Sequence, residues 1–358
     1  MALRSPRSGD RTVNHGRRAL LRMSAAGILL GALPLPAGAA GKGDRRVNLY
    51  VDDALAAYGF PDGHPFGIDR QAAFLREARG QGLVAQTTTR GSRAATREEL
   101  TRFHLDDYVT RVATAEELGL IVLDNGDTPV FPDVYRSSAH VVGAALDGLD
   151  QIMKGECRRT MQPIGGLHHA GRGHAAGFCV FNDLGVVIET LRRAHGVKRI
   201  AYLDIDVHHG DGIFYSFEDV PELIFADVHQ NGRTHYPGTG CEHETGKGAA
   251  RGTKLNIELA PGSGDREFLQ AWPRVEAHFE QFQPEFFVFQ CGADGLDGDP
   301  LAQLAYTPAV HAHATMRLMR LADRFSGGRI MAFGGGGYDR SSLAHAWSAV
   351  LRALLSRG

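Results

Sequence analysis

The stretch Tyr202–Gly212 reads YLDIDVHHGDG and places three aspartates and two histidines directly after an apolar run. In an extended segment, residues i, i+2 and i+4 point to the same side, so Asp204, Asp206 and His208 could all face one cleft. Two acids and a histidine in an apolar setting repel or neutralise one another unless a cation lies among them. Carboxylate and imidazole ligands suit zinc, and also Fe(II) or Mn(II). The stretch therefore predicts a metal site rather than a capping network at a strand end.

A third metal ligand should come from another strand end. The segment FQCGADGLDGDP (289–300) offers Asp294, just past the apolar run 285–292. Three protein ligands leave a fourth position open for water, which a catalytic metal needs. Asp297 and Asp299 lie nearby, and we interpret both as loop and turn residues.

Four apolar runs are typical of buried parallel strands; they span residues 199–205, 223–229, 285–292 and 329–335. Helical patterns lie between them. One covers residues 182–196, with Asn182 as its cap and Gly196 at its end, and another begins at Thr307 and Pro308. We predict an α/β fold with a single parallel sheet sandwiched by helices. Ligands then bind beyond the carboxyl ends of the strands.

Two further motifs carry side chains suited to acid–base chemistry. His168 and His169 are adjacent in PIGGLHHAGRGHAAGFCVFND (163–183), and beside a metal they could supply a general base and a general acid. Each imidazole needs a carboxylate behind it, and Asp204 and Asp211 are the spare acids.

The third motif is FGGGGYD (333–339), in which four glycines precede Tyr338. The tyrosine hydroxyl could donate to a developing oxyanion. No Lys-Ser/Thr pair follows the glycines, so a P-loop is excluded.

The first forty residues differ from the rest. Six arginines and one aspartate are followed by a short apolar run, AAGILLGALPLPAGAA (25–40), which ends in small residues. This arrangement predicts an export signal over residues 1–39, and the pair Arg17-Arg18 resembles a twin-arginine signal. We expect a periplasmic or exported protein, or a cytoplasmic one if the start site is misassigned. The apolar run is too short and too often interrupted by Pro and Gly to span a membrane stably.

Residues 40–358 are expected to form one domain. The formal charge of the whole chain is −2, and residues 1–39 carry +5, so the remainder carries −7. A net negative charge argues against a nucleic-acid partner and suits a cationic or neutral substrate. The sequence makes no prediction of the oligomeric state.

At this point a family resemblance is evident. The segments GGLHHA, GFCVFND, YLDIDVHHGDG, YPGTG, QCGAD, GDPL and GGGGY resemble, in that order, the motifs of the zinc-dependent histone deacetylase family. Its bacterial members include acetoin-utilisation-type deacetylases and acetylpolyamine amidohydrolases. The resemblance runs from about Val47 to the C-terminus. It implies the arginase/deacetylase fold and hydrolysis of the amide of acetyl-lysine or acetylated small amines, with release of acetate.

The resemblance also implies roles for single residues. The zinc ligands, or Fe²⁺ ligands as the alternative, would be Asp206, His208 and Asp294. His169, backed by Asp211, would act as general base and acid, while His168, backed by Asp204, would tune the electrostatics. Tyr338 would polarise the acyl carbonyl.

The family's substrate channel carries over to six residues, namely Gly177, Phe178, Tyr236, Leu301, Asp127 and Arg70. Asp127 matches a rim acid that grips substrate amides, and Arg70 matches the arginine of an internal acetate channel. Tyr236 stands where many relatives have phenylalanine, so this wall is more polar. Leu301 stands where polyamine-selective relatives carry a glutamate, which argues against long acetylpolyamines.

Family members also hold a monovalent cation, such as K⁺, mostly through backbone carbonyls. The matching positions here are Asp204, Asp206, His208, Asp227 and Val228. Asp227 replaces a common serine.

Three alternative functions remain at this stage. The first is an acetylpolyamine amidohydrolase. The second is a binuclear manganese ureohydrolase, which shares the fold. That chemistry needs a second metal with more carboxylate ligands, and in this sequence the histidine pair stands in place of those ligands. The third, from a different class, is a catalytically silent protein that binds acylated amines.

Overall fold

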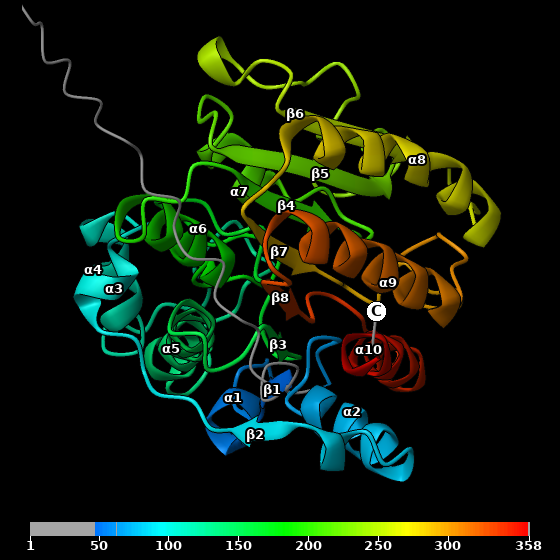
Figure 1. The fold of residues 1–358 in the computed structure, drawn as a ribbon. Helices are drawn as coiled ribbons and strands as arrows, with labels where there is room; N and C mark the ends of the chain where they lie inside the picture. The colour runs from blue at the N-terminus through cyan, green and yellow to red at the C-terminus, as the bar shows by residue number, and fades with distance from the viewer. Residues whose placement is uncertain (1–46, 62, 357–358) are drawn as a thin grey trace, which may run out of the picture. The chain divides into compact units, whose positions relative to one another are not determined.

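One eight-stranded parallel sheet organises the computed structural model of this chain, which describes residues 47–61 and 63–356 (Figure 1). The strands lie in the order β2-β1-β3-β8-β7-β4-β5-β6, and every pairing between neighbours is parallel. Their bounds are β1 Val47–Tyr50, β2 Thr88–Arg90, β3 Arg159–Gln162, β4 Ile200–Asp204, β5 Leu223–Gln230, β6 Lys254–Leu259, β7 Phe286–Gln290 and β8 Ile330–Phe333.

Helices cover both faces of this sheet (Figure 1). One face carries α1 Asp53–Ala56, α3 Arg97–Leu100, α4 Asp106–Ala113, α5 Val134–Met153, α6 Asp183–Arg193 and α7 Asp211–Ser216. The other carries α2 Arg70–Gly80, α8 Asp265–Phe282, α9 Pro308–Phe325 and α10 Arg340–Leu355. Two short 3-10 turns, η1 Val84–Gln86 and η2 Gly248–Ala250, lie in the loops.

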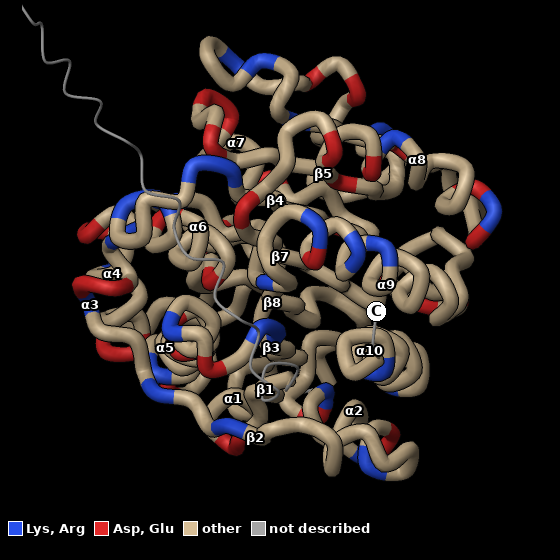
Figure 2. Tube along the Cα trace, viewed as in Figure 1, with Lys and Arg blue, Asp and Glu red and all other residues tan. Residues whose placement is uncertain are grey.

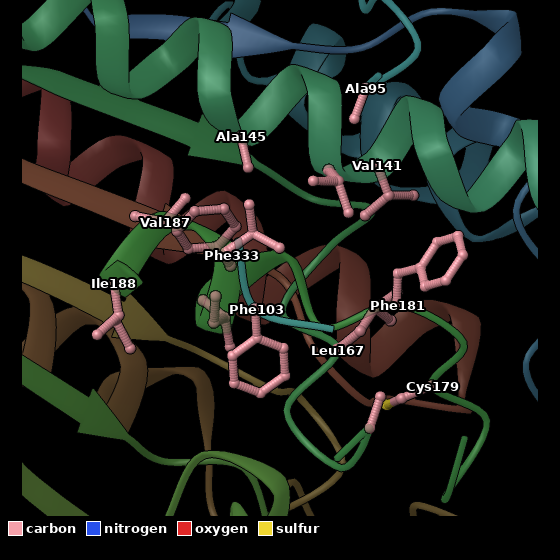
Figure 3. Close-up of a cluster of buried hydrophobic side chains, with 14 of the residues drawn as sticks. Ala95, Phe103, Val141, Ala145, Leu167, Cys179, Phe181, Val187, Ile188 and Phe333 are labelled. Carbon is pink, nitrogen blue, oxygen red and sulfur yellow. The ribbon is translucent and has the colours of Figure 1, made fainter. Parts of the chain in front are cut away.

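The two hydrophobic cores follow from the alternation of side chains along each strand. In β4, Tyr202 packs into the core under α5 and α6, whereas Leu203 packs into the core under α8, α9 and α10. Figure 3 shows part of the first core, where Phe103, Phe181 and Phe333 lie near aliphatic residues of α5 and α6. Because both faces are covered, the central strands β4, β7 and β8 are largely apolar, with Asp204 and Gln290 at the carboxyl ends of β4 and β7.

The predicted parallel sheet with helices on both faces is confirmed. The four predicted strands correspond to β4, β5, β7 and β8, and the largest differences are two residues at the end of β7 and two at the end of β8. In β8 the apolar run was expected to continue to residue 335, but the strand ends at Phe333. Gly335 has a φ of +66°, which belongs to a turn rather than to extended backbone.

The predicted helix starts are also confirmed. The Asn182 side chain accepts a hydrogen bond from the backbone N–H of Gly185, and α6 begins at the next residue, Asp183. Thr307 caps α9, which has Pro308 at its first position. The C-terminal end of the first helix was placed too late, since α6 ends at Arg193 rather than near Gly196.

The predicted export signal, residues 1–39, lies outside the described residues. All of the described residues belong to a unit that runs from Gly41 to Gly358. Within them, none of the helices combines the length and the apolar character that crossing a membrane requires. Charged residues of both signs are spread along helices and loops, while the central strands contain few of them (Figure 2).

Candidate active site

Four neighbouring strands bring the sequence motifs together. β3, β8, β7 and β4 are adjacent in the sheet. The histidine pair follows β3, the glycine-rich loop follows β8, Asp294 follows β7, and Asp206 and His208 follow β4. Parallel strands end at the same edge, so segments far apart in the sequence converge on one site there.

Asp206, His208 and Asp294 form a compact, buried triad. They can each offer one ligand atom within 4.8 Å of the others. His208 Nδ1 lies 2.9 Å from Asp206 Oδ1 and 3.2 Å from Asp294 Oδ2. The backbone N–H of Val207 donates to Asp294 Oδ1 at 3.1 Å, which fixes that carboxylate against the end of β4.

The two buried carboxylates of the triad favour the binding of a cation. Burial disfavours a charged imidazole, yet the carboxylates of Asp206 and Asp294 outweigh burial and raise the pKa of His208 to about 10. Burial, together with the charge of Asp206, raises the pKa of Asp294 to about 7. A divalent cation would satisfy both carboxylates and leave His208 neutral, as metal binding requires.

Unused ligand capacity supports the same conclusion. Asp294 Oδ2 is buried, and apart from its 3.2 Å contact with His208 Nδ1 it makes no hydrogen bond within the part of the chain that the structure describes. Glycines line the other side of the carboxylates. A Cβ on Gly336 would lie 1.9 Å from Asp294 Oδ2, and one on Gly292 would lie 2.0 Å from Asp206 Oδ2. Two carboxylates and one imidazole, closely lined by backbone, fit a catalytic metal ion.

Each histidine of the pair has a carboxylate behind it. His168 Nδ1 is 2.8 Å from Asp204 Oδ2, which also accepts the hydroxyl of Tyr202. His169 Nδ1 is 2.6 Å from Asp211 Oδ1 at the start of α7. These contacts fix the ring orientations and leave each Nε2 available for other partners.

His169 is kept neutral by its surroundings. Burial, and then the neighbouring His168, lower its pKa to about 4, although Asp211 acts in the opposite direction. A neutral imidazole at physiological pH can accept a proton, as a general base must.

Tyr338 lines the same space as the two histidines and is only 8% exposed. Burial, followed by the charges of Asp294 and Asp206, raises the pKa of its hydroxyl well above the ordinary range. The hydroxyl therefore stays protonated and can donate a hydrogen bond. Its ring packs edge-on against Phe178, with ring centroids 5.9 Å apart.

A cavity of about 210 Å³ leads to this site. Its walls include five of the six residues predicted for the substrate channel, namely Asp127, Gly177, Phe178, Tyr236 and Leu301. His169, His208 and Tyr338 lie at its inner end. A second space of about 10 Å³ beyond it, lined by both histidines of the pair, is about the size of one water molecule.

Arg70, the sixth predicted residue, does not line this cavity. Its buried guanidinium packs on the Phe66 ring, 3.9 Å from the centroid, and donates to the carbonyls of Gly335 and Gly337. Arg70 thus supports the glycine-rich loop from behind. Its Nη1 has no hydrogen-bond partner among the described residues, and a role in an acetate channel stays a prediction.

Among the residues predicted for a monovalent cation, Asp206 and His208 belong to the triad, and Asp204, Asp227 and Val228 lie in the neighbouring strands β4 and β5. Asp204 and Asp227 are register partners in β4 and β5. Asp227 Oδ1 is 2.7 Å from His229 Nδ1, and its Oδ2 accepts the N–H of Gly210 at 2.9 Å. Val228 is buried. The carboxylate of Asp227 is thus already engaged, and the cation site stays a prediction.

Sequence reasoning missed several residues of the site. Gln290, at the end of β7, donates to Asp206 Oδ2 at 2.9 Å, and a polar residue ending an apolar run was the available signal. His235 lines the cavity and stacks on His208, with ring centroids 4.6 Å apart. Asp339, which follows Tyr338, caps α10 by accepting the N–H of Ser342 at 2.7 Å.

This fold and site define a hydrolase whose buried acidic triad can hold a metal next to a histidine–aspartate pair. Comparison with known proteins narrows the class. A family model described as the Histone deacetylase domain matches residues 64–354. The chain is 36% identical over 272 residues to the acetoin utilization protein AcuC of Bacillus subtilis (strain 168), which covers 73% of this chain and 68% of that protein.

Two further relatives agree. Histone deacetylase RPD3 of Saccharomyces cerevisiae (strain ATCC 204508 / S288c) is 30% identical over 312 residues, which cover 85% of this chain and 70% of RPD3. The crystal structure of the HDA15 HD domain superposes with a TM-score of 0.79 at 26% identity, covering 87% of this chain and 88% of that one. The chain belongs to the histone deacetylase family, resembles its bacterial AcuC type, and is a hydrolytic deacetylase. The family is generally zinc-dependent.

Proposed function

We propose that this enzyme is a zinc-dependent deacetylase that releases acetate from acetyl-lysine or from acetylated small amines. The observation that carries the proposal is one arrangement. His208 of the buried triad, His169 of the His169–Asp211 pair and Tyr338 all line one cavity of about 210 Å³.

Asp206, His208 and Asp294 are the proposed zinc ligands. When bound there, zinc would supply Lewis-acid polarisation of the acyl carbonyl and activation of a water molecule. Fe²⁺ has similar ligand preferences and is the alternative metal.

The protein groups handle the protons. His169 accepts a proton from the attacking water through Nε2, because Asp211 occupies Nδ1. The same imidazole then gives the proton to the leaving amine. The Tyr338 hydroxyl donates to the carbonyl oxygen as negative charge develops on it. His168 is oriented by its contact with Asp204, and its ring tunes the electrostatics of the site.

The channel suits a narrow aliphatic stem. Phe178 and Tyr236 offer aromatic faces, and each methylene buried between them contributes roughly 0.8 kcal/mol. Asp127 is the acidic side chain of the cavity wall, which favours amine or amide donors at the mouth. Leu301 offers no charge to a long polyamine.

The test is acetate release by the purified zinc-loaded protein, with Asp206→Ala as the inactive control. An acetyl-lysine peptide and N-acetylputrescine are compared side by side. Turnover of the peptide alone identifies a peptide or protein deacetylase. Turnover of the small amine alone identifies an acetylpolyamine-type enzyme and shows that Leu301 was a poor guide. Absence of turnover with zinc bound contradicts the proposed substrates and favours the silent binding protein.

We also propose that residues 1–39 direct export through a twin-arginine-like pathway. The basic and apolar segments of this stretch support the proposal. Fusion of residues 1–39 to a reporter that is active only after export is the test, with Arg17→Lys/Arg18→Lys as the control. A reporter that stays in the cytoplasm would contradict export.

A further inference from the structure

We propose that Asp299 is a positioning residue for the deacetylation reaction, which holds Tyr338 at the angle that the oxyanion requires. This inference rests on the proposed function of Tyr338. Asp299 lies in the segment between the proposed metal ligand Asp294 and the channel residue Leu301. It is 6% exposed, although aspartate is usually found at the surface.

The carboxylate of Asp299 joins two loops. Its Oδ2 accepts the backbone N–H of Tyr338 at 2.8 Å and that of Asp339 at 3.4 Å. Its Oδ1 accepts the N–H of Leu301 at 3.0 Å. One buried carboxylate therefore links the residue that donates to the oxyanion with a residue of the channel wall.

Tyr338 needs such an anchor because of the residues before it. Gly334 to Gly337 form a run of four glycines, which have the largest backbone freedom in the unfolded loop. Their carbonyls are held by Arg70, at Gly335 and Gly337, but Arg70 does not bond Tyr338 itself. The N–H of Tyr338 is held by Asp299.

The carbonyl of Tyr338, which belongs to the following peptide group, is held by Arg340. Its Nη1 donates to the carbonyl of Tyr338 at 2.8 Å, and its Nη2 pairs with Asp69 at 2.7 Å. That pair is partly exposed, whereas the Asp299 contact is buried. A hydrogen bond to a buried charged acceptor resists thermal motion better than an exposed ion pair, so Asp299 sets the position of the tyrosine.

The variant Asp299→Asn preserves the shape of the side chain but has a single acceptor oxygen. That oxygen cannot accept both from the N–H groups of Tyr338 and Asp339 and from the N–H of Leu301. We expect kcat to fall about 10- to 100-fold, as for other supports of an active-site group, with KM and zinc content nearly unchanged. Asp297→Asn is the matched control, because Asp297 is exposed in the same loop. It should keep wild-type kcat.

A double-mutant cycle separates positioning from general stability. If Asp299 acts through the tyrosine hydroxyl, Asp299→Asn should change kcat by less than about twofold once Tyr338→Phe is present. A full 10- to 100-fold loss in the Tyr338→Phe background would overturn the proposal, as would a wild-type kcat for Asp299→Asn. If Asp299→Asn does not fold, the same cycle is run with Asp299→Glu.

Amide hydrogen exchange of the Tyr338 N–H gives a readout that needs no substrate. Exchange should become faster in Asp299→Asn and stay unchanged in Asp297→Asn; unchanged protection in both variants would overturn the proposal. Wild-type turnover reports separately on the proposed function, so failure of the substrate assignment and failure of the Asp299 inference are distinguishable.

Discussion

Asp206, His208 and Asp294 at the inner end of the channel are at most 8% exposed, whereas Tyr236 and Leu301 at its mouth are 41% and 37% exposed. The inner residues follow central strands and bond to one another, to backbone and to Gln290. The mouth residues lie on loops. Buried charges interact strongly because little water screens them, so the inner end tolerates little change. The mouth, in contact with water, can vary its substrate preference at small cost to the fold.

The largest loss of activity should follow removal of a proposed metal ligand at the inner end of the channel. Asp206→Ala removes one proposed metal ligand and leaves His208 and Asp294 without it. A metal contributes several kcal/mol to transition-state stabilisation, so acetate release should fall by at least roughly 10³-fold. Metal analysis of the purified variant should show substoichiometric zinc. Full zinc occupancy together with wild-type activity would show that the triad is not the catalytic centre.

Tyr338→Phe should have the next largest effect. Loss of one donor to a developing oxyanion costs about 10²- to 10³-fold in kcat. KM should change little, because the hydroxyl acts mainly in the transition state. Steady-state kinetics on the better substrate measure both constants. An equal rise in KM with an unchanged kcat would assign Tyr338 to ground-state binding instead.

Asp211→Asn should make His169 a weaker general base. His169 lies between the inner end of the channel and its mouth. Asp211 raises the pKa of His169, while burial and His168 lower it to about 4. Without the carboxylate the pKa falls further, so the acid limb of kcat/KM should move to lower pH. The plateau should drop about 10- to 100-fold, because the imidazole is a weaker base. A pH–rate profile that extends from below pH 3 to pH 8 tests both, and an acid limb shifted upward would contradict this role.

The smallest change in activity should follow substitution of a residue at the mouth of the channel. Leu301→Glu adds a charge at a half-exposed position, where an ion pair is worth about 0.2–1 kcal/mol. The ratio of kcat/KM for N-acetylspermidine over N-acetylputrescine should rise at most about fivefold. Leu301→Gln, which adds polarity without charge, should leave the ratio unchanged. A large change in kcat for both substrates would mean that the mouth is not separable from the inner end.

Local sequence chemistry predicted much of this protein. The alternation Asp204, Asp206, His208 after an apolar run indicated a ligand cluster at a strand end. The glycine-rich segment indicated Tyr338 as a candidate donor to an oxyanion. Cap residues such as Asn182 and Thr307 marked helix starts, because capping is a contact within one turn of the chain.

Other residues could not be assigned from the sequence, because their partners are distant along the chain. Asp299 reads as a turn residue until the glycine-rich loop is placed beside it, 39 residues away. Arg70 was assigned to the channel by resemblance, yet its guanidinium supports carbonyls more than 260 residues away.

By itself the sequence determined which side chains end the strands, because the periodicity and turn chemistry of a strand are local. Which strand ends are neighbours was decided by the tertiary structure. The order β3-β8-β7-β4 places His169, Tyr338 and Asp206 around one space, with Asp294 next to Asp206 in the triad. That order depends on how helices pack on both faces of the sheet, a property of the whole chain rather than of any one segment.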